Sequence, residues 1–201
     1  MYELKKIKSD VRRELLELRH AIPGEQKEKM DAAIAERFFS GVSFRHSSVV
    51  LTYVSTAHET GTAAIIRGCL EKGKAVACPR TDPERGLMKF LIIKSEDDLE
   101  PGNFGLLEPK EGCPDYADYA AELAAKEGRP AQTVCIIPCL AIDHGGFRIG
   151  YGKGFYDRFL SEYDGLKIGI CYSECVRKEL PHGKYDVKLD VGITEKKITV
   201  Y

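Results

Sequence analysis

The chain has 201 residues, and its 30 lysines and arginines against 31 aspartates and glutamates give a net charge of −1. Hydrophobic residues make up 43% and aromatic residues 9%, which is typical of a folded globular protein and excludes a disordered chain. The near-neutral charge disfavours a nucleic-acid binder, because such proteins need a clearly basic face.

Apolar residues spaced three and four apart predict an amphipathic helix over the first twenty residues, and a second helix follows over about 25–39. Short apolar runs then alternate with helical stretches. The predicted strands are 48–54, 74–78, 87–93, 133–142 and 166–172; the predicted helices are 62–70, 117–127 and 154–163; and 95–112 is a predicted loop. This alternation predicts one α/β domain over residues 1–201, with a largely parallel sheet covered on both faces.

Five glycines fall within ten positions between a predicted strand and a predicted helix: Gly145, Gly146, Gly150, Gly152 and Gly154. The spacing fits neither a Walker A loop, since Phe147 and Gly154 occupy required positions, nor a dinucleotide fingerprint, since position 155 is phenylalanine. From the spacing alone, a phosphate-binding loop and a flexible turn are equally open. If phosphate binds here, Arg148 and Lys153 could neutralise it.

The chain contains seven cysteines and no apolar run long enough for an export signal or a membrane span. An odd number of cysteines in a chain of this length favours reduced thiols, so we expect a cytoplasmic protein. We also expect a soluble monomer without membrane contact. The pairs Cys135–Cys139 and Cys171–Cys175 could suggest a zinc site. Because the first pair lies on a predicted strand, buried thiols are the better interpretation.

Ordered motifs along nearly the whole chain resemble the 5-formyltetrahydrofolate cyclo-ligase family, also called methenyltetrahydrofolate synthetases. The run Ile137-Pro-Cys-Leu-Ala-Ile-Asp143, followed by Arg148-Ile-Gly-Tyr-Gly-Lys-Gly-Phe-Tyr-Asp-Arg158, carries most of the resemblance. The other matching segments are Lys8-x-x-x-Arg12, Pro79-Arg80, Gly105-Leu-Leu-Glu-Pro109 and Tyr185-Asp186-Val-Lys-Leu-Asp190.

The resemblance implies a Rossmann-like three-layer α/β domain with a mostly parallel central sheet and helices on both faces. It also implies conversion of 5-formyltetrahydrofolate to 5,10-methenyltetrahydrofolate. This reaction would require Mg²⁺, and it would consume ATP and release ADP and phosphate. Phosphorylation of the formyl oxygen would let N10 close the ring. Phosphoryl transfer asks mainly for positioning and electrostatics, so no cysteine needs a catalytic role.

The resemblance also implies the site residues. The ATP-binding residues would be Lys8, Arg12, Arg80, Arg148, Ile149, Gly150, Tyr151, Gly152, Lys153, Gly154, Phe155 and Tyr156, of which Arg148, Lys153 and Tyr156 would be catalytic. The folate-binding residues would be Thr52, Ala57, Glu59, Tyr151, Gly152, Lys153, Gly154 and Phe155. The magnesium carboxylates would be Asp157 and Asp186, although Asp157 could instead only complement a helix dipole.

The sequence departs from the family pattern after the first predicted strand. Ala57 stands where we expect the glutamate that contacts the pterin, and we favour Glu59, ahead of His58, as its replacement. Ala57 also motivates an alternative function, a nucleotide- or folate-binding regulatory protein without turnover. The stretch 113–130 is longer than is usual in the family and is either a lid helix or a surface insertion.

Overall fold

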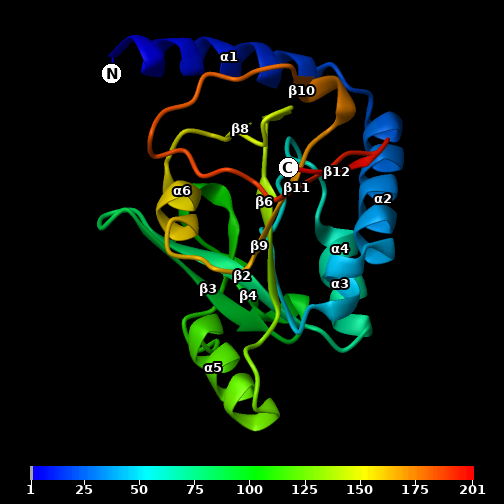
Figure 1. Ribbon diagram of the computed structural model, residues 1–201, viewed down its shortest axis with the longest axis vertical. Helices are drawn as coiled ribbons and strands as arrows, with labels where there is room; N and C mark the ends of the chain where they lie inside the picture. The colour runs from blue at the N-terminus through cyan, green and yellow to red at the C-terminus, as the bar shows by residue number, and fades with distance from the viewer. Residues whose placement is uncertain (1) are drawn as a thin grey trace.

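A seven-stranded sheet forms the centre of the protein in the computed structural model, which describes residues 2–201 (Figure 1). The strand order is β12-β11-β9-β6-β1-β2-β3. Adjacent strands from β11 to β2 pair in parallel, whereas the edge strands β12 and β3 pair antiparallel with their neighbours. The bounds are β1 (Val49–Leu51), β2 (Ala75–Asp82), β3 (Leu87–Ile93), β6 (Thr133–Pro138), β9 (Leu166–Ile170), β11 (Val191–Ile193) and β12 (Ile198–Val200).

Helices cover both faces of this sheet, as Figure 1 shows. The helices α2 (Gly24–Ser40), α3 (Val42–His46) and α4 (Ala63–Glu71) lie on one face, and α5 (Tyr116–Glu127) and α6 (Phe155–Leu160) pack against β3 on the other. The first helix, α1 (Tyr2–His20), crosses one end of the sheet, where the parallel strands finish. The three-layer, mostly parallel α/β architecture is therefore confirmed.

Two small sheets extend the domain at its edges. The strands β4 (Leu99–Pro101) and β5 (Leu107–Pro109) form a hairpin, and β7 (Ala141–Asp143) pairs with β8 (Arg148–Ile149) and β10 (Val176–Arg177). Short 3₁₀ turns occupy Glu96–Asp98, Asn103–Gly105 and Ser173–Cys175. The predicted loop over 95–112 thus contains a hairpin, and the predicted strand over 133–142 is broken after Pro138.

The central strands are buried on both sides, as a parallel sheet between helix layers requires. Every residue of β1 and all but the first residue of β6 are buried. All seven cysteines are free, and only Cys113 among them is not fully buried. Burial raises the pKa of Cys69 and Cys139 to about 12, so these thiols stay protonated at neutral pH. Within the described part of the chain, every helix is too short or too polar to cross a bilayer.

Candidate active site

A cavity of about 500 Å³ is lined by residues of α1 and of the segments that follow the parallel strands. Its walls come from α1, the segment after β1, the β2–β3 hairpin, the β4–β5 hairpin, the loop before α6 and the segment that contains Asp186. Open α/β sheets commonly bind ligands at this position, outside the carboxyl ends of their strands.

The glycine-rich loop forms one wall, and each residue from Arg148 to Asp157 lines the cavity. Gly152 and Gly154 have φ values of +90° and +73°, which side chains other than glycine rarely adopt. A Cβ on Gly152 would lie 3.0 Å from Cζ of Arg12, so glycine also allows this guanidinium to approach the loop. The Arg12 Nε donates to the carbonyl oxygen of Gly150 at 2.8 Å. The loop and α1 are therefore joined directly.

Cations from distant parts of the chain gather on this side of the cavity. Lys8 Nζ pairs with Asp186, and Arg148 Nη2 donates to Asp157 Oδ1 at 2.8 Å. The Arg148 side chain is only 5% exposed and also donates to the carbonyl oxygen of Val187. Burial lowers the pKa of Arg12, and the Asp186 and Asp157 carboxylates partly oppose that effect. Three cations and two carboxylates thus form one charged cluster.

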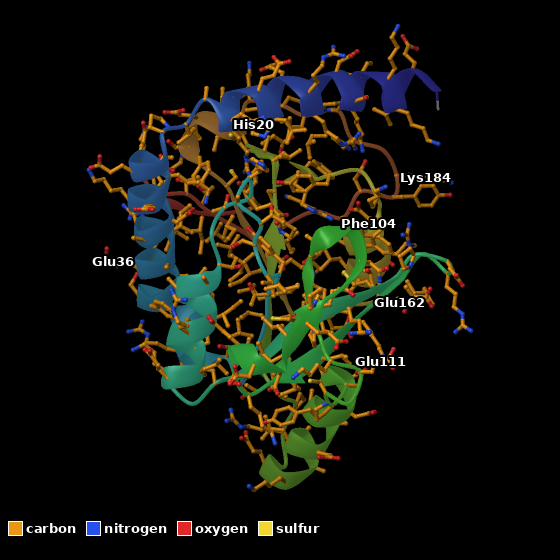
Figure 2. All side chains as sticks on the ribbon, turned by 180° about the vertical axis from the view of Figure 1, so that it is seen from behind. His20, Glu36, Phe104, Glu111, Glu162 and Lys184 are labelled. Carbon is orange, nitrogen blue, oxygen red and sulfur yellow. The ribbon has the colours of Figure 1, made fainter. Side chains whose placement is uncertain are left out.

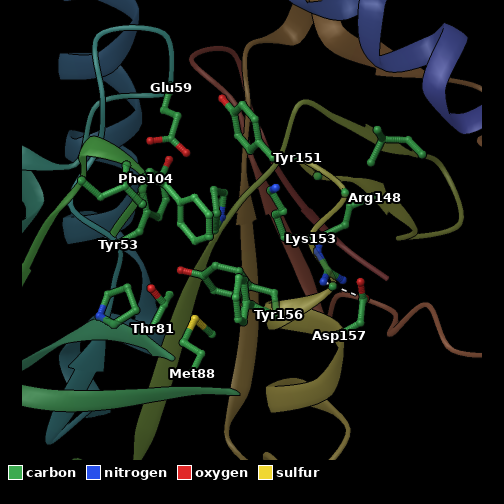
Figure 3. Close-up of a pocket in the computed structure, with 18 of the residues that line it drawn as sticks. Tyr53, Glu59, Thr81, Met88, Phe104, Arg148, Tyr151, Lys153, Tyr156 and Asp157 are labelled. Atoms are coloured by element: carbon green, nitrogen blue, oxygen red, sulfur yellow. Dashed lines mark hydrogen bonds and ion pairs between the residues drawn. The ribbon is translucent and has the colours of Figure 1, made fainter. Parts of the chain in front are cut away.

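The opposite side of the cavity is apolar, with acidic groups set into it. Figure 3 shows Tyr53, Glu59, Phe104 and Thr81 facing the Arg148–Asp157 pair across the cavity, with Tyr156 between them. The Glu59 carboxylate accepts from the Thr56 N–H at 2.9 Å, which folds the side chain back from its turn toward the cavity. The other apolar or acidic lining residues on the strands and hairpins are Val54, Pro79, Met88, Leu106, Leu107, Glu108 and Pro138.

Tyr156 lines this space, and its hydroxyl is buried. Its oxygen has no hydrogen-bond partner among the residues that the structure describes. Burial raises the pKa of Tyr156 well above its ordinary value, so the phenol stays protonated and can donate a hydrogen bond to a ligand. Burial raises the pKa of Tyr151 as well. A buried donor without a partner is costly, and a bound ligand would remove that cost.

Most of the predicted site residues therefore converge. Lys8, Arg12, Glu59 and Asp186 join Arg148–Asp157 on the cavity wall. Arg80, Thr52 and Ala57, which the resemblance also implies for the site, do not line the cavity in this structure.

The reasons for these differences are local. Side chains alternate along a strand, so Pro79 and Thr81 face the cavity while Arg80 turns away and pairs with Glu100 at 2.8 Å. Thr52 is fully buried, and its N–H donates to the carbonyl oxygen of Ala77. Ala57 lies exposed at the tip of a turn whose later residue, Glu59, reaches the cavity.

Sequence reasoning missed the apolar wall and Glu108. Glu108 lies within a motif segment, and Thr81 directly follows one. Only the alternation of these two residues with Pro109 and Arg80 along the hairpin strands would have pointed to them. Phe104 carried no signal in the sequence. Its φ of +57° places it in a left-handed turn, from which its ring reaches the Lys153 ammonium at 5.1 Å. Figure 2 shows Phe104 at the outer face of this hairpin segment.

Comparisons with known proteins all indicate the same enzyme family. The model of the 5-formyltetrahydrofolate cyclo-ligase family matches residues 4–195. A probable 5-formyltetrahydrofolate cyclo-ligase of Caenorhabditis elegans is 28% identical, with 100% of this chain and 98% of that protein covered. The 5-formyltetrahydrofolate cyclo-ligase of Escherichia coli K12 is 26% identical over 90% of this chain and 96% of its own length.

Two solved structures are similar as well. The 5,10-methenyltetrahydrofolate synthetase of Aquifex aeolicus superposes with a TM-score of 0.80 at 28% identity, covering 96% of this chain and 92% of that one. The synthetase of Mycoplasma pneumoniae superposes with a TM-score of 0.68 at 19% identity, covering 94% and 98%, and so supports the fold.

Proposed function

The chain belongs to the 5-formyltetrahydrofolate cyclo-ligase family, and from that premise we propose that it converts 5-formyltetrahydrofolate to 5,10-methenyltetrahydrofolate while cleaving ATP to ADP and phosphate. One observation carries the proposal: a single cavity has a cationic side, suited to a triphosphate, and an apolar side with acidic groups, suited to a pterin. The reaction needs these two ligands side by side, because the phosphoryl group passes directly between them.

The cationic side would hold the triphosphate. Lys8, Arg12 and Lys153 present ammonium and guanidinium groups to the cavity, and Arg148 lies behind them in its pair with Asp157. Charge-assisted hydrogen bonds from such groups are roughly twice as strong as neutral ones. The open backbone at Gly152 and Gly154 would let phosphate oxygens approach the loop closely. Arg80 is left out of this site because it faces away.

The donor set also fits a magnesium ion that is shared with the nucleotide. Within residues 2–201 no group of three or more acidic, histidine or cysteine side chains is placed to hold a metal alone. Mg²⁺ bound with phosphates needs only one or two carboxylates, because waters and phosphate oxygens complete its octahedron. Asp157 and Asp186 line the same side of the cavity and would supply those carboxylates. When bound, the ion would neutralise charge on the phosphates.

The apolar side would hold the pterin. Tyr53, Met88 and Phe155 offer flat or flexible apolar surface, and Glu59 offers a carboxylate to the ring's N–H groups. With Glu59 on the cavity wall, no observation favours the non-catalytic regulatory protein that Ala57 had suggested. The carboxylate missing at position 57 is supplied two residues later.

With the two ligands bound side by side, the reaction would proceed in two steps. The formyl oxygen attacks the γ-phosphorus of ATP, and the bond to the ADP oxygen breaks. N10 of the folate next attacks the activated formyl carbon and releases its proton to solvent, and the phosphate leaves with the C–O bond electrons to give the methenyl product. Lys153 would stabilise the transferring phosphoryl charge, and the protonated Tyr156 would donate to an oxygen at the reacting centre.

The decisive experiment incubates the purified protein with MgATP and 5-formyltetrahydrofolate. We expect the near-ultraviolet absorbance of the methenyl product to grow in step with ADP release. Omission of either substrate should abolish both signals. If ADP and methenyl product both fail to form, the proposed function is wrong.

A further inference from the structure

Glu108, on β5, has one carboxylate oxygen that is held and one that is free. The residue is 2% exposed and lines the cavity. Its Oε1 accepts from the Thr81 N–H at 3.1 Å and from the Thr81 hydroxyl at 2.6 Å. Its Oε2 is buried and has no hydrogen-bond partner among residues 2–201. A buried carboxylate oxygen without a donor is costly, so this oxygen lacks a partner that a ligand could supply.

The neighbouring protein groups are already engaged. The Gly102 backbone lies so close that a Cβ on it would collide with the Glu108 carboxylate, yet the Gly102 N–H donates to the carbonyl oxygen of Leu106 at 2.8 Å. Arg80, on the strand that carries Thr81, turns to the other face and pairs with Glu100. The Glu108 side chain lines the cavity, so a ligand bound there can supply the donor that Oε2 lacks.

We propose that Glu108 is a specificity-determining residue for the folate, whose free oxygen accepts a hydrogen bond from an N–H group of the reduced pteridine. This inference rests on the proposed function and adds a second recognition residue to Glu59. A reduced pteridine has N–H donors at N3, at N8 and on the 2-amino group, which is more than one carboxylate can satisfy. Glu59 and Glu108 come from different segments of the cavity wall, so they can serve different donors.

Glu108→Gln tests the proposal by direct binding. Glutamine keeps the size and an oxygen for Thr81, but it places an NH₂ donor where the free acceptor was. We expect the dissociation constant for 5-formyltetrahydrofolate, measured by calorimetry without ATP, to rise roughly 10- to 100-fold, the effect of losing one charge-assisted hydrogen bond. The affinity for MgATP should be unchanged.

Glu100→Gln is the matched control, because Glu100 is the direct register partner of Glu108 across the β4–β5 hairpin and its carboxylate pairs with Arg80 instead of lining the cavity. Its folate affinity should equal that of the wild type. An equal loss in both variants, or no loss in Glu108→Gln, would overturn the proposal.

Substrate analogues separate recognition from a purely structural role. One analogue lacks the 2-amino group, another has carbon in place of N8, and a third carries a methyl group on N3. If Glu108 accepts from one of these groups, that analogue binds the wild type weakly but loses nothing further in Glu108→Gln. Strictly additive losses for all three analogues would refute the assignment.

If the glutamine variant does not fold, the dissociation constant is measured for Glu108→Asp instead. Aspartate keeps the negative charge, but its shorter side chain moves the free carboxylate oxygen away from the ligand. If the wild type itself fails to bind 5-formyltetrahydrofolate, the proposed function is wrong, and the outcome is distinguishable from a failure of this inference.

Discussion

At the scale of single residues, Asp186 shows how the two ends of the chain set the chemistry of one group. Burial by itself would raise its pKa, but hydrogen bonds from the Lys8 ammonium and the Gly183 N–H bring the pKa below the ordinary value of 3.8. The unfolded chain therefore holds this proton more tightly than the folded chain. The pair stabilises the fold above the ordinary pKa, and this stabilisation is lost as pH falls through the lower folded-state pKa.

We expect Asp186→Asn to remove the contribution of this pair to the pH dependence of the free energy of unfolding. The difference in free energy of unfolding between wild type and variant should shrink as pH falls below about 4, and it should be constant near neutrality. Urea titrations at a series of pH values measure it. Asp118→Asn, an exposed change on α5, is the control and should parallel the wild type throughout. An Asp186→Asn curve parallel to the wild type would contradict the pairing with Lys8.

Lys153 is exposed at the cavity, with its ammonium over the Phe104 ring, so it is free to move to a phosphate. We expect Lys153→Ala to lower kcat/KM for ATP roughly 10- to 100-fold, because one charge-assisted contact is lost. The melting temperature should not change. Lys126→Ala, on the exposed end of α5, should leave the kinetics untouched. Wild-type kinetics in Lys153→Ala would remove Lys153 from the nucleotide site.

At the scale of elements, the loop between β8 and α6 owes its shape to glycine. We expect Gly152→Ala to destabilise the fold by about 1 kcal/mol through its positive φ, and also to weaken ATP binding, because the new Cβ would displace Arg12. Gly73→Ala is the matched control: its φ is +70°, and nothing lies within 4 Å of the added Cβ.

Thermal unfolding and ATP titration distinguish the two variants. Both should be destabilised to a similar degree, but only Gly152→Ala should bind ATP more weakly. Equal ATP affinity in the two variants would mean that Arg12 does not contact the nucleotide through this loop.

The stretch 113–130, for which the sequence allows a lid helix or a surface insertion, contains the surface helix α5. Asp115 caps α5 by accepting from the Ala117 N–H at 2.8 Å, and Gly128 ends it with a φ of +68°. Figure 1 shows α5 at the end of the molecule opposite α1, and no residue of α5 lines the cavity. A lid helix would have to reach the cavity, and α5 does not. The stretch 113–130 is therefore a surface insertion at the outer edge of the sheet.

At the scale of the whole molecule, acidic and basic side chains are unevenly distributed, although the net charge is only −1. Residues 95–127 carry ten acidic and two basic side chains, which gives this segment a net charge of −8. The cavity instead gathers Lys8, Arg12, Arg148 and Lys153 from the two ends of the chain. A nearly neutral protein can thus offer a cationic site to one small polyanion without a basic surface.

Because these cations come from separate segments, we expect a bound nucleotide to restrict the motion of all of those segments. We expect ATP binding to slow amide hydrogen exchange at once in α1, in residues 150–156 and in residues 183–187, because the same ligand would hold all three segments. Exchange in α5 should not change. Mass spectrometry of the exchanged protein measures this, and protection confined to residues 150–156 would show that α1 takes no part in nucleotide binding.

The sequence by itself determined the α/β class, the first helices and the glycine-rich wall, because hydrophobic period and glycine spacing are local properties. It placed Lys8, Arg12, Arg148 and Asp186 in one site only through ordered motifs, since no local rule brings residues so far apart together. The tertiary structure decided which side of each strand faces the cavity. That choice turned Arg80 away and left one oxygen of Glu108 without a partner, because the direction of a side chain on a strand depends on pairing across the fold.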